Sequence, residues 1–214
     1  MSRLVSVEAD GPERARAELE RSIGTGGVVV FPADGLYGLA CDPLNEAAVA
    51  RIHELKGRDE GRSSAVMYFS PLAMRELLGG AGPRTQGAMS ALLPGPVTLV
   101  IANPDRRYPL ACREDPERLG VRLIDGPLAG AMTPVFQTSA NRSGEAPVAA
   151  LEEVDSRILD GADLAIDGGR LSGHPSTVID ISRLDGAGEW SVLREGGLPA
   201  EAVEAALRAD DDPR

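Results

Sequence analysis

The sequence is poor in aromatic residues, which make up 3% of its 214 residues. We therefore expect a core built from Val, Leu, Ile and Ala, and we do not expect base stacking on aromatic rings as the main mode of nucleic-acid binding. Basic residues are also in deficit, because 22 Lys and Arg stand against 33 Asp and Glu, for a formal net charge of −11. Proteins that bind phosphate backbones broadly carry a basic surplus. The composition therefore disfavours nonspecific RNA or DNA binding and leaves room only for a local basic concavity.

Cysteine and histidine are scarce as well. Cys41 and Cys112 form neither a disulfide framework nor a metal pattern, and we expect both to be small buried residues. His53 and His174 have no partner at a metal-ligand spacing, so no protein-held metal site is predicted. The N-terminus has no apolar signal core, and no run of about 18 apolar residues occurs. We expect a cytoplasmic protein without a membrane partner.

The signature loops of several enzyme classes are missing from the sequence. It has no Gly-x-x-x-x-Gly-Lys-Ser/Thr loop and no glycine-rich strand-turn-helix fingerprint, which argues against a P-loop NTPase and a Rossmann dinucleotide binder. A Gly-x-Ser-x-Gly elbow is also missing. A hydrolase of nucleotide-like compounds has no candidate pair of nucleophile and base.

The chain of 214 residues is long enough for one large domain or two small ones, and residues 208–214 are expected to form an acidic, solvated tail. Helices and short strands interleave without strict alternation, which indicates an α/β or α+β fold with a mixed sheet and helices packed outside it. Asn45 is a candidate N-cap of the second helix. We expect helices in residues 10–27, 45–58, 71–80, 84–93 and 199–209, and strands in 26–35, 63–70, 95–103, 120–124, 134–141, 163–169, 176–182 and 190–196.

The stretch "ELKGRDEGRSS" places three cations, Lys56, Arg58 and Arg62, in an acidic chain. One interpretation is structural, because basic residues in a last helical turn favour the helix dipole by about 0.3–1 kcal/mol. The other is functional, because a basic loop suits a polyphosphate, with lysine as a point charge and arginine as a planar fork.

The stretch "QTSANRSGEAPV" places Ser139 and Asn141 in a loop after an expected strand. Hydroxyl and amide groups at a strand end can bind a nucleotide, but the same residues also form ordinary turns. Ser176, at a strand entry, and Arg194, beside two glycines, are weaker candidates.

Together, "FPADGLYGLACDP", "IHELKGR", "LLPGPVTLVI", "GVRLIDGP", "QTSANRSGEAP", "STVID" and "LREGG" resemble the YrdC-like family of threonylcarbamoyl-AMP synthases, in that family's order from about residue 10 to 200. The resemblance implies a single domain over residues 1–214, with its core at about 10–200. The domain would have a twisted sheet around a large, positively charged concave cavity. It also implies a nucleotidyltransferase that makes threonylcarbamoyl-AMP from L-threonine, bicarbonate or CO₂, and ATP, and releases pyrophosphate. The product would serve the N6-threonylcarbamoyladenosine modification of tRNA through downstream tRNA-modification proteins, and some members bind double-stranded RNA.

The resemblance also assigns roles to residues of this chain, with Mg²⁺ arriving on ATP rather than in a protein site. The catalytic pair would be Lys56 and Arg58; the nucleotide-binding residues would be Lys56, Arg58, Arg62, Ser139, Asn141 and Arg194; and the amino-acid-binding residues would be Tyr37, Arg122, Ser139 and Ser176.

The sequence departs from the family pattern on the amino-acid side. Ala33 and Gly35 stand where the family has hydroxyl residues, and Met67 lies near a position often held by histidine. A site that binds a substrate hydroxyl gains specificity from such donors, so the departures weaken the case for L-threonine more than the case for ATP. The alternative is a divergent paralogue that binds nucleotide or double-stranded RNA without threonine-dependent turnover. The segment "DEGRSS", residues 59–64, is the candidate lid.

Overall fold

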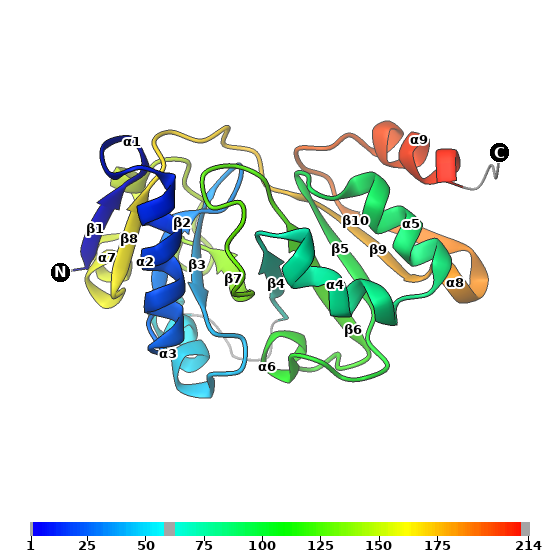
Figure 1. Cartoon of the computed structure of the whole chain (residues 1–214), viewed down its shortest axis with the longest axis horizontal. Helices are drawn as coiled ribbons and strands as arrows, with labels where there is room; N and C mark the ends of the chain where they lie inside the picture. The colour runs from blue at the N-terminus through cyan, green and yellow to red at the C-terminus, as the bar shows by residue number, and fades with distance from the viewer. Residues whose placement is uncertain (1, 58–62, 211–214) are drawn as a thin grey trace.

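The computed structural model describes residues 2–57 and 63–210, and its strands form one mixed ten-stranded sheet (Figure 1). The strand order is β1-β8-β2-β3-β7-β4-β6-β5-β9-β10. This sheet confirms the predicted fold class. The strands are β1 (Arg3–Ser6), β2 (Val29–Pro32), β3 (Tyr37–Cys41), β4 (Ala65–Tyr68), β5 (Val97–Ala102), β6 (Arg118–Leu123), β7 (Val135–Ser139), β8 (Leu164–Asp167), β9 (Thr177–Arg183) and β10 (Glu189–Arg194).

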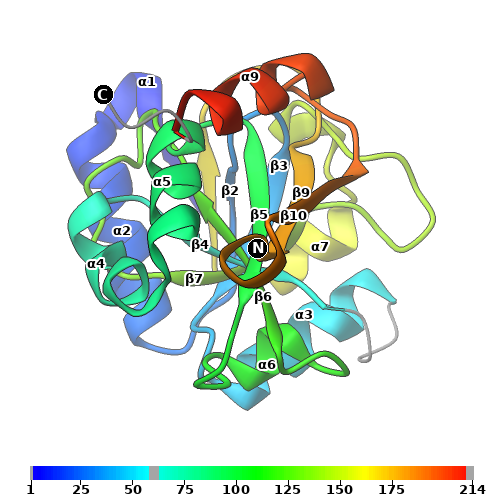
Figure 2. The same ribbon diagram turned by 90° about the vertical axis from the view of Figure 1, so that its right-hand side faces the viewer.

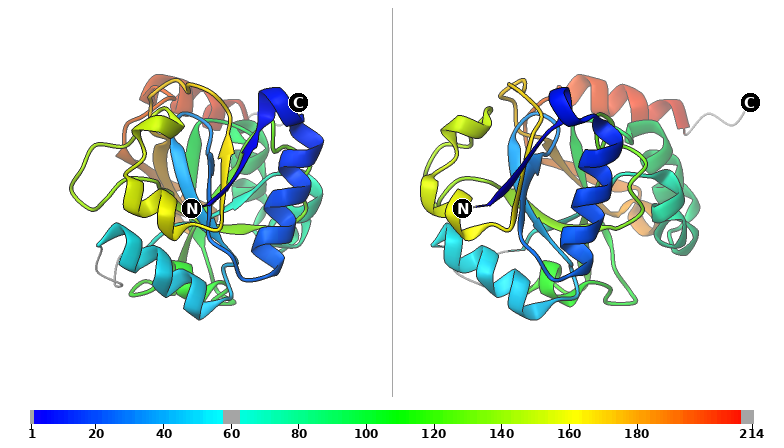
Figure 3. Two further views of the ribbon diagram at one scale, coloured as in Figure 1. Left: turned by 90° about the vertical axis from the view of Figure 1, so that its left-hand side faces the viewer. Right: turned by 60° about the vertical axis from the view of Figure 1, so that its left-hand side comes forward.

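Helices flank the sheet on both sides. Figure 2 shows α2, α4 and α5 on one side of the strands and α3 and α7 on the other, and Figure 3 shows α2 beside the part of the sheet that contains β1 and β8. The helices are α1 (Val7–Asp10), α2 (Pro12–Gly24), α3 (Glu46–Lys56), α4 (Pro71–Gly80), α5 (Pro83–Leu92), α6 (Pro109–Cys112), α7 (Ser156–Gly161), α8 (Leu184–Ala187), α9 (Ala200–Asp210) and the 3-10 turn η1 (Leu151–Glu153).

Buried aliphatic side chains form two clusters, one on each face of the central strands. Neighbouring residues of a strand point to opposite faces, so Val66 belongs to one cluster and Met67 to the other. The aliphatic core agrees with the composition, and all three phenylalanines are buried within it. Both cysteines are free and buried, which confirms their prediction.

Helix α3 forms where the sequence predicts it and places Lys56 beside the loop after β7. The side chain of Asn45 caps the helix by accepting a 3.0 Å hydrogen bond from the amide of Ala48. The helix ends at Lys56, and the next residue, Gly57, caps it with a left-handed φ of 56°, which suits glycine. Arg58 and Arg62, together with most of the candidate lid 59–64, lie outside the described residues.

The connection from β8 to β9, residues Gly168–Ser176, is called the strap below. β8 and β9 are separated in the sheet by six other strands, so the strap crosses most of the molecule. Figure 1 shows it, in yellow, running along the upper edge of the sheet. Over the part of the chain that the structure describes, no helix is long and apolar enough to cross a membrane.

Candidate functional site

A cavity of about 480 Å³ opens over the centre of the sheet. Its volume lies in the range typical of small-molecule sites. The floor is the face on which alternate residues of neighbouring strands gather: Arg118, Gly120 and Arg122 come from β6, and the register sets Gly120 opposite Ala65 of β4 and Val100 of β5. The small residues Gly120 and Ala65 leave the hollow open.

Arg122 is a buried cation in this cavity, with 5% of its surface exposed. Its guanidinium donates to the carbonyl of Ala33 and to the carboxylate of Asp34, both over 3.4 Å. Its Nε is buried and has no hydrogen-bond partner among the described residues. A buried donor without a partner is costly, so this side chain is suited to receive an anion.

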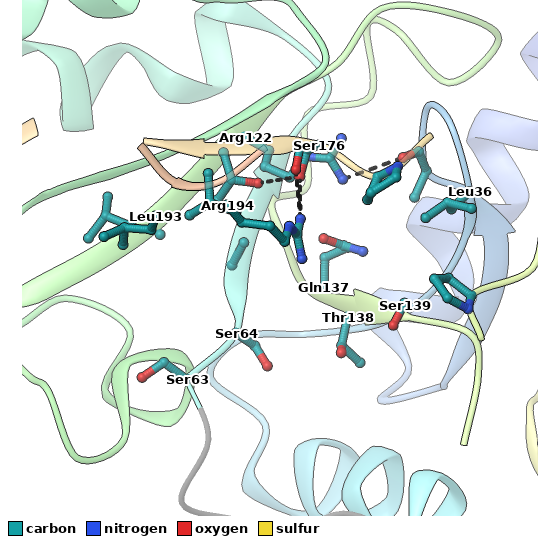
Figure 4. Close-up of a pocket in the computed structure, with 18 of the residues that line it drawn as sticks. Leu36, Ser63, Ser64, Arg122, Gln137, Thr138, Ser139, Ser176, Leu193 and Arg194 are labelled. Carbon is teal, nitrogen blue, oxygen red and sulfur yellow. Dashed lines mark hydrogen bonds between the residues drawn. The ribbon is translucent and has the colours of Figure 1, made fainter. Parts of the chain in front are cut away.

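Arg194 lies near Arg122, at the same end of the cavity. It donates to the carbonyl oxygen of Ser176 over 2.7 Å and to its hydroxyl over 3.2 Å, and the Ser176 hydroxyl is 2.8 Å from that of Thr98. Figure 4 shows Arg122, Ser176 and Arg194 grouped together, with Gln137 and Ser139 below them. Together, the first three of these residues and Thr98 form a group that presents two guanidiniums and two hydroxyls. The guanidiniums come from β6 and β10, and the hydroxyls come from β5 and from the residue before β9.

The electrostatics of this group favour a bound anion. Burial lowers the pKa of Arg122 to about 10; the carboxylate of Asp34 opposes that shift, and the charge of Arg194 adds to it. Burial also lowers the pKa of Arg194. Both side chains stay protonated at neutral pH, with Asp34 as the one carboxylate in contact with Arg122 among the described residues. The acidic chain therefore does contain a local basic concavity.

Arg118 lines the cavity further along β6 and is neutralised by its neighbours. It contacts the carboxylate of Asp115 and, over 2.8 Å, that of Asp180. Hydrogen bonds to Asp115 and then to Asp180 raise the pKa of Arg118. Near it, Val100, Val178 and Leu193 form an apolar wall.

Lys56 connects α3 to the end of β7 and the loop after it. The expectation that Ser139 lies in a loop is wrong, because it pairs with Gly38 of β3 as the last residue of β7, and only Asn141 lies in the loop. Its ammonium donates to the carbonyl of Ser139 and, over 2.7 Å, to that of Asn141, and only 3% of the residue is exposed. The amide of Ser143 returns a 2.8 Å hydrogen bond to the Lys56 carbonyl. Lys56 therefore holds the backbone that presents Ser139 to the cavity.

Asn141 and Tyr37 also secure backbone segments around the cavity. The Asn141 amide donates to the carbonyls of Arg142 and Glu145, while its Oδ1 is buried without a partner in the described chain. The Tyr37 hydroxyl donates to the carbonyl of Gly169 over 2.8 Å and accepts from the amide of Gly168 over 3.0 Å. Burial raises the pKa of Tyr37 to about 12.

The predicted site residues fall into three groups. Tyr37, Arg122, Ser139, Ser176 and Arg194 line the cavity. Lys56 and Asn141 lie directly behind Ser139, and Arg58 and Arg62 are outside the described residues. Their roles as catalytic, nucleotide-binding or amino-acid-binding residues stay predictions.

The sequence reasoning missed Arg118 and His174, which also line the cavity. Arg118 had a signal: in "RLGVRL" it lies four residues before Arg122, and alternation along a strand puts both on one face. His174 had none, because its place depends on how the strap closes over the sheet.

The structure shows where the residues that depart from the family pattern lie. Ala33 and Gly35 line the cavity next to Arg122. Met67 is fully buried in a core cluster, directly opposite Arg122 in the strand register. The described residues contain no group of three His, Cys, Asp or Glu that could hold a metal ion.

Comparison with known proteins identifies relatives over most of the chain. A family model described as "Telomere recombination", for the Sua5/YciO/YrdC family, matches residues 21–196. A threonylcarbamoyl-AMP synthase of Thiobacillus denitrificans is 33% identical over 181 residues, which cover 81% of this chain and 95% of the relative. The human protein of that name is 32% identical over 211 residues, covering 89% of this chain and 72% of its own.

Solved structures share the fold. Sua5 of P. abyssi, in complex with L-threonine, matches with a TM-score of 0.80 at 27% identity, covering 96% of this chain, and this chain spans 60% of that Sua5. YciO of E. coli matches with a TM-score of 0.79 at 24% identity, over 95% of this chain and 100% of its own. The family model and the curated relatives confirm the resemblance seen in the sequence, and the solved structures share its fold: the chain belongs to the Sua5/YciO/YrdC family.

Proposed function

We propose that this chain is an L-threonylcarbamoyladenylate synthase, which joins L-threonine, bicarbonate-derived CO₂ and ATP into threonylcarbamoyl-AMP with release of pyrophosphate. The observation that carries the proposal is the buried guanidinium of Arg122, which faces the cavity with two long hydrogen bonds and an unpartnered Nε. The relatives named threonylcarbamoyl-AMP synthase and the threonine complex of Sua5 support it.

The cavity divides into two ends that suit the two larger substrates. The carboxylate of the amino acid would bind Arg122 and the hydroxyl of Ser176, because an arginine fork matches a carboxylate. The nucleotide would extend from Arg194, which lies next to Ser176 between the two ends, toward Ser139 and Arg118, with its base or ribose against the apolar wall of Val100, Val178 and Leu193. Arg58 and Arg62 are proposed to reach the phosphates from the segment after α3.

The chemistry requires positioning more than covalent help from the protein. The amine of the amino acid adds to CO₂ and loses a proton, which gives a carbamate. A carbamate oxygen then attacks the α-phosphorus of ATP, the bond to the pyrophosphate oxygen breaks, and pyrophosphate leaves with the electron pair. Arginines that face the reacting groups would stabilise the charge that moves onto the phosphates.

Mg²⁺ would enter as a part of the ATP substrate, bridging its phosphates. In this proposal Lys56 acts as a positioning residue, because its ammonium holds the carbonyls of Ser139 and Asn141. The product would pass to a downstream tRNA-modification protein, and tRNA or double-stranded RNA is a proposed partner.

The second candidate is a divergent paralogue that binds nucleotide without threonine-dependent turnover, which the non-hydroxyl residues Ala33 and Gly35 favour. Two measurements on the same protein separate the two: ATP binding, and pyrophosphate release from MgATP with and without bicarbonate, with L-threonine, with each of the other amino acids or with none. Release that requires both supports the synthase. ATP binding without release for any amino acid supports the paralogue and refutes the synthase.

A further inference from the structure

The strap forms one wall of the cavity at its amino-acid end. His174 and Pro175 line the cavity, and the strap ends at Ser176, the hydrogen-bond partner of Arg194. Two backbone hydrogen bonds fix the strap in this place: the amide of Leu171 donates to the carbonyl of Ala149 over 2.8 Å, and that of Gly173 donates to the carbonyl of Gly35 over 2.9 Å. Its position is therefore set by the segments that it crosses.

Gly35 allows this approach because it has no side chain. A Cβ at Gly35 would lie 2.1 Å from the carbonyl oxygen of His174 and 2.9 Å from the hydroxyl of Ser172. The first distance is far inside van der Waals contact with a backbone atom, so any other residue at position 35 requires the strap to move. The space of a side chain at position 35 is thus occupied by the strap itself.

The contact between Gly35 and His174 lies close to Arg122. The guanidinium of Arg122 contacts the carbonyl of Ala33 and the carboxylate of Asp34, the two residues before Gly35. An amino acid whose carboxylate binds Arg122 would therefore lie in the same part of the cavity as Gly35 and the strap. Ala33 and Gly35 offer no side-chain donor there, whereas an imidazole can both donate and accept.

We propose that His174 is a specificity-determining residue, which hydrogen-bonds the side-chain hydroxyl of a small β-hydroxy amino acid such as L-threonine, and that Gly35 and Ser172 position it. This inference rests on the proposed function, since it assigns the amino-acid end of the same cavity. Ser172 acts as a positioning residue, because its hydroxyl accepts a 3.4 Å hydrogen bond from the His174 amide. Pro175 adds an apolar surface to the wall.

The test compares L-threonine with L-valine, which has the same shape but no hydroxyl. A site that hydrogen-bonds a hydroxyl discriminates strongly against the analogue that lacks it. We expect the wild-type protein to prefer threonine, and His174→Ala to lower the ratio of kcat/KM for threonine over valine about tenfold or more, with the KM for ATP unchanged. His174→Asn, which retains a donor and an acceptor, should keep part of the preference.

Two further variants control for damage to the wall. Gly35→Ala displaces the backbone of His174 without adding a hydroxyl and should lower the threonine preference, whereas Gly79→Ala, at a position with open space around its Cβ, should not. Arg170→Ala changes a strap residue whose side chain pairs with Glu153 at the surface, and it should leave the preference unchanged.

Equilibrium dialysis of labelled threonine and valine, without ATP, separates the inference from the proposed function. If the wild-type protein binds threonine more tightly than valine and His174→Ala removes the difference, the inference holds even where no pyrophosphate is released, and only the synthase assignment fails. If neither amino acid binds, if both bind equally to the wild-type protein, or if His174→Ala keeps the full difference, the inference is overturned.

Discussion

The burial of Arg122 costs free energy in the folded chain, but it suits the proposed binding of a carboxylate. Its burial lowers its pKa to about 10, and its hydrogen bonds do not satisfy all its donors. Replacing a buried, poorly paired charge by an apolar residue of similar volume is often neutral or stabilising. The charge therefore reduces stability in the empty protein, and a bound carboxylate would compensate for it.

We predict that Arg122→Met lowers amino-acid-dependent pyrophosphate release at least about a hundredfold, while the free energy of unfolding stays the same or rises by about 1 kcal/mol. Urea unfolding and steady-state kinetics on the same samples measure both. Arg183→Met, at an exposed pair with Glu189 outside the cavity, is the matched control and should keep its activity. A variant that loses stability and activity together would mean that Arg122 is mainly structural.

Helix α3 positions the site through its last residue, Lys56. This residue is the only lysine among the 22 basic residues of the chain. An ammonium is compact and directs its donors to converging carbonyls, whereas a guanidinium is a flat fork. In the structure, the donors of Lys56 join the last turn of α3 to Ser139 at the end of β7 and to Asn141 in the loop that follows. Removing the ammonium leaves those partly buried carbonyls without this donor.

We predict that Lys56→Met lowers the free energy of unfolding by about 1–3 kcal/mol and weakens ATP binding at least tenfold. Because the chain has one lysine, protein labelled with ¹³C-lysine gives a single side-chain spin system. Its Cε signal should shift when MgATP is added to the wild-type protein and stay fixed when L-threonine is added alone. An unchanged signal at saturating ATP would place the nucleotide elsewhere.

The elements themselves were predictable to the extent that their signals are local. Helix α3 was predicted with its cap, because the apolar spacing and Asn45 both lie within the segment. Strands β1 and β3 were missed. β1 has little apolar alternation and pairs with β8, which is far away in the sequence, and β3 has Gly38 in its interior, a residue that weakens strand signals.

The site residues were also predictable only where their signals are local in the sequence. Alternation along β6 brings Arg118 and Arg122 onto one face, so a reading with period two could have found both. Gly35 lies between β2 and β3, and His174 lies in the strap between β8 and β9. Their contact joins segments that are far apart in the sequence, so no local pattern encodes it. Sequence reasoning therefore identified the loss of hydroxyls at Ala33 and Gly35 but not the segment that fills the space.

At the scale of the whole molecule, the pH dependence of stability follows from groups buried in the sheet. Burial, assisted by Asp42, raises the pKa of the Cys41 thiol to about 12, and burial raises that of Tyr37 to about 12. Unfolded cysteine and tyrosine ionise near pH 8.5 and 10, roughly. The unfolded chain therefore loses these protons first, and stability falls as the pH rises from about 8.5 to 12. Arg122 acts in the opposite direction above about pH 10, because its folded-state pKa is lowered.

The contribution of Cys41 can be isolated by substitution. We predict that Cys41→Ala is less stable than the wild-type protein at pH 7, because it leaves a cavity in β3, but that its free energy of unfolding falls less steeply at alkaline pH. Each proton held only by the folded state contributes a slope of about 1.4 kcal/mol per pH unit, so the two curves should converge between about pH 9 and 12. Chemical unfolding at half-unit steps of pH measures both slopes. Parallel curves would mean that the thiol ionises equally in the folded and unfolded chains, and that β3 admits water at high pH.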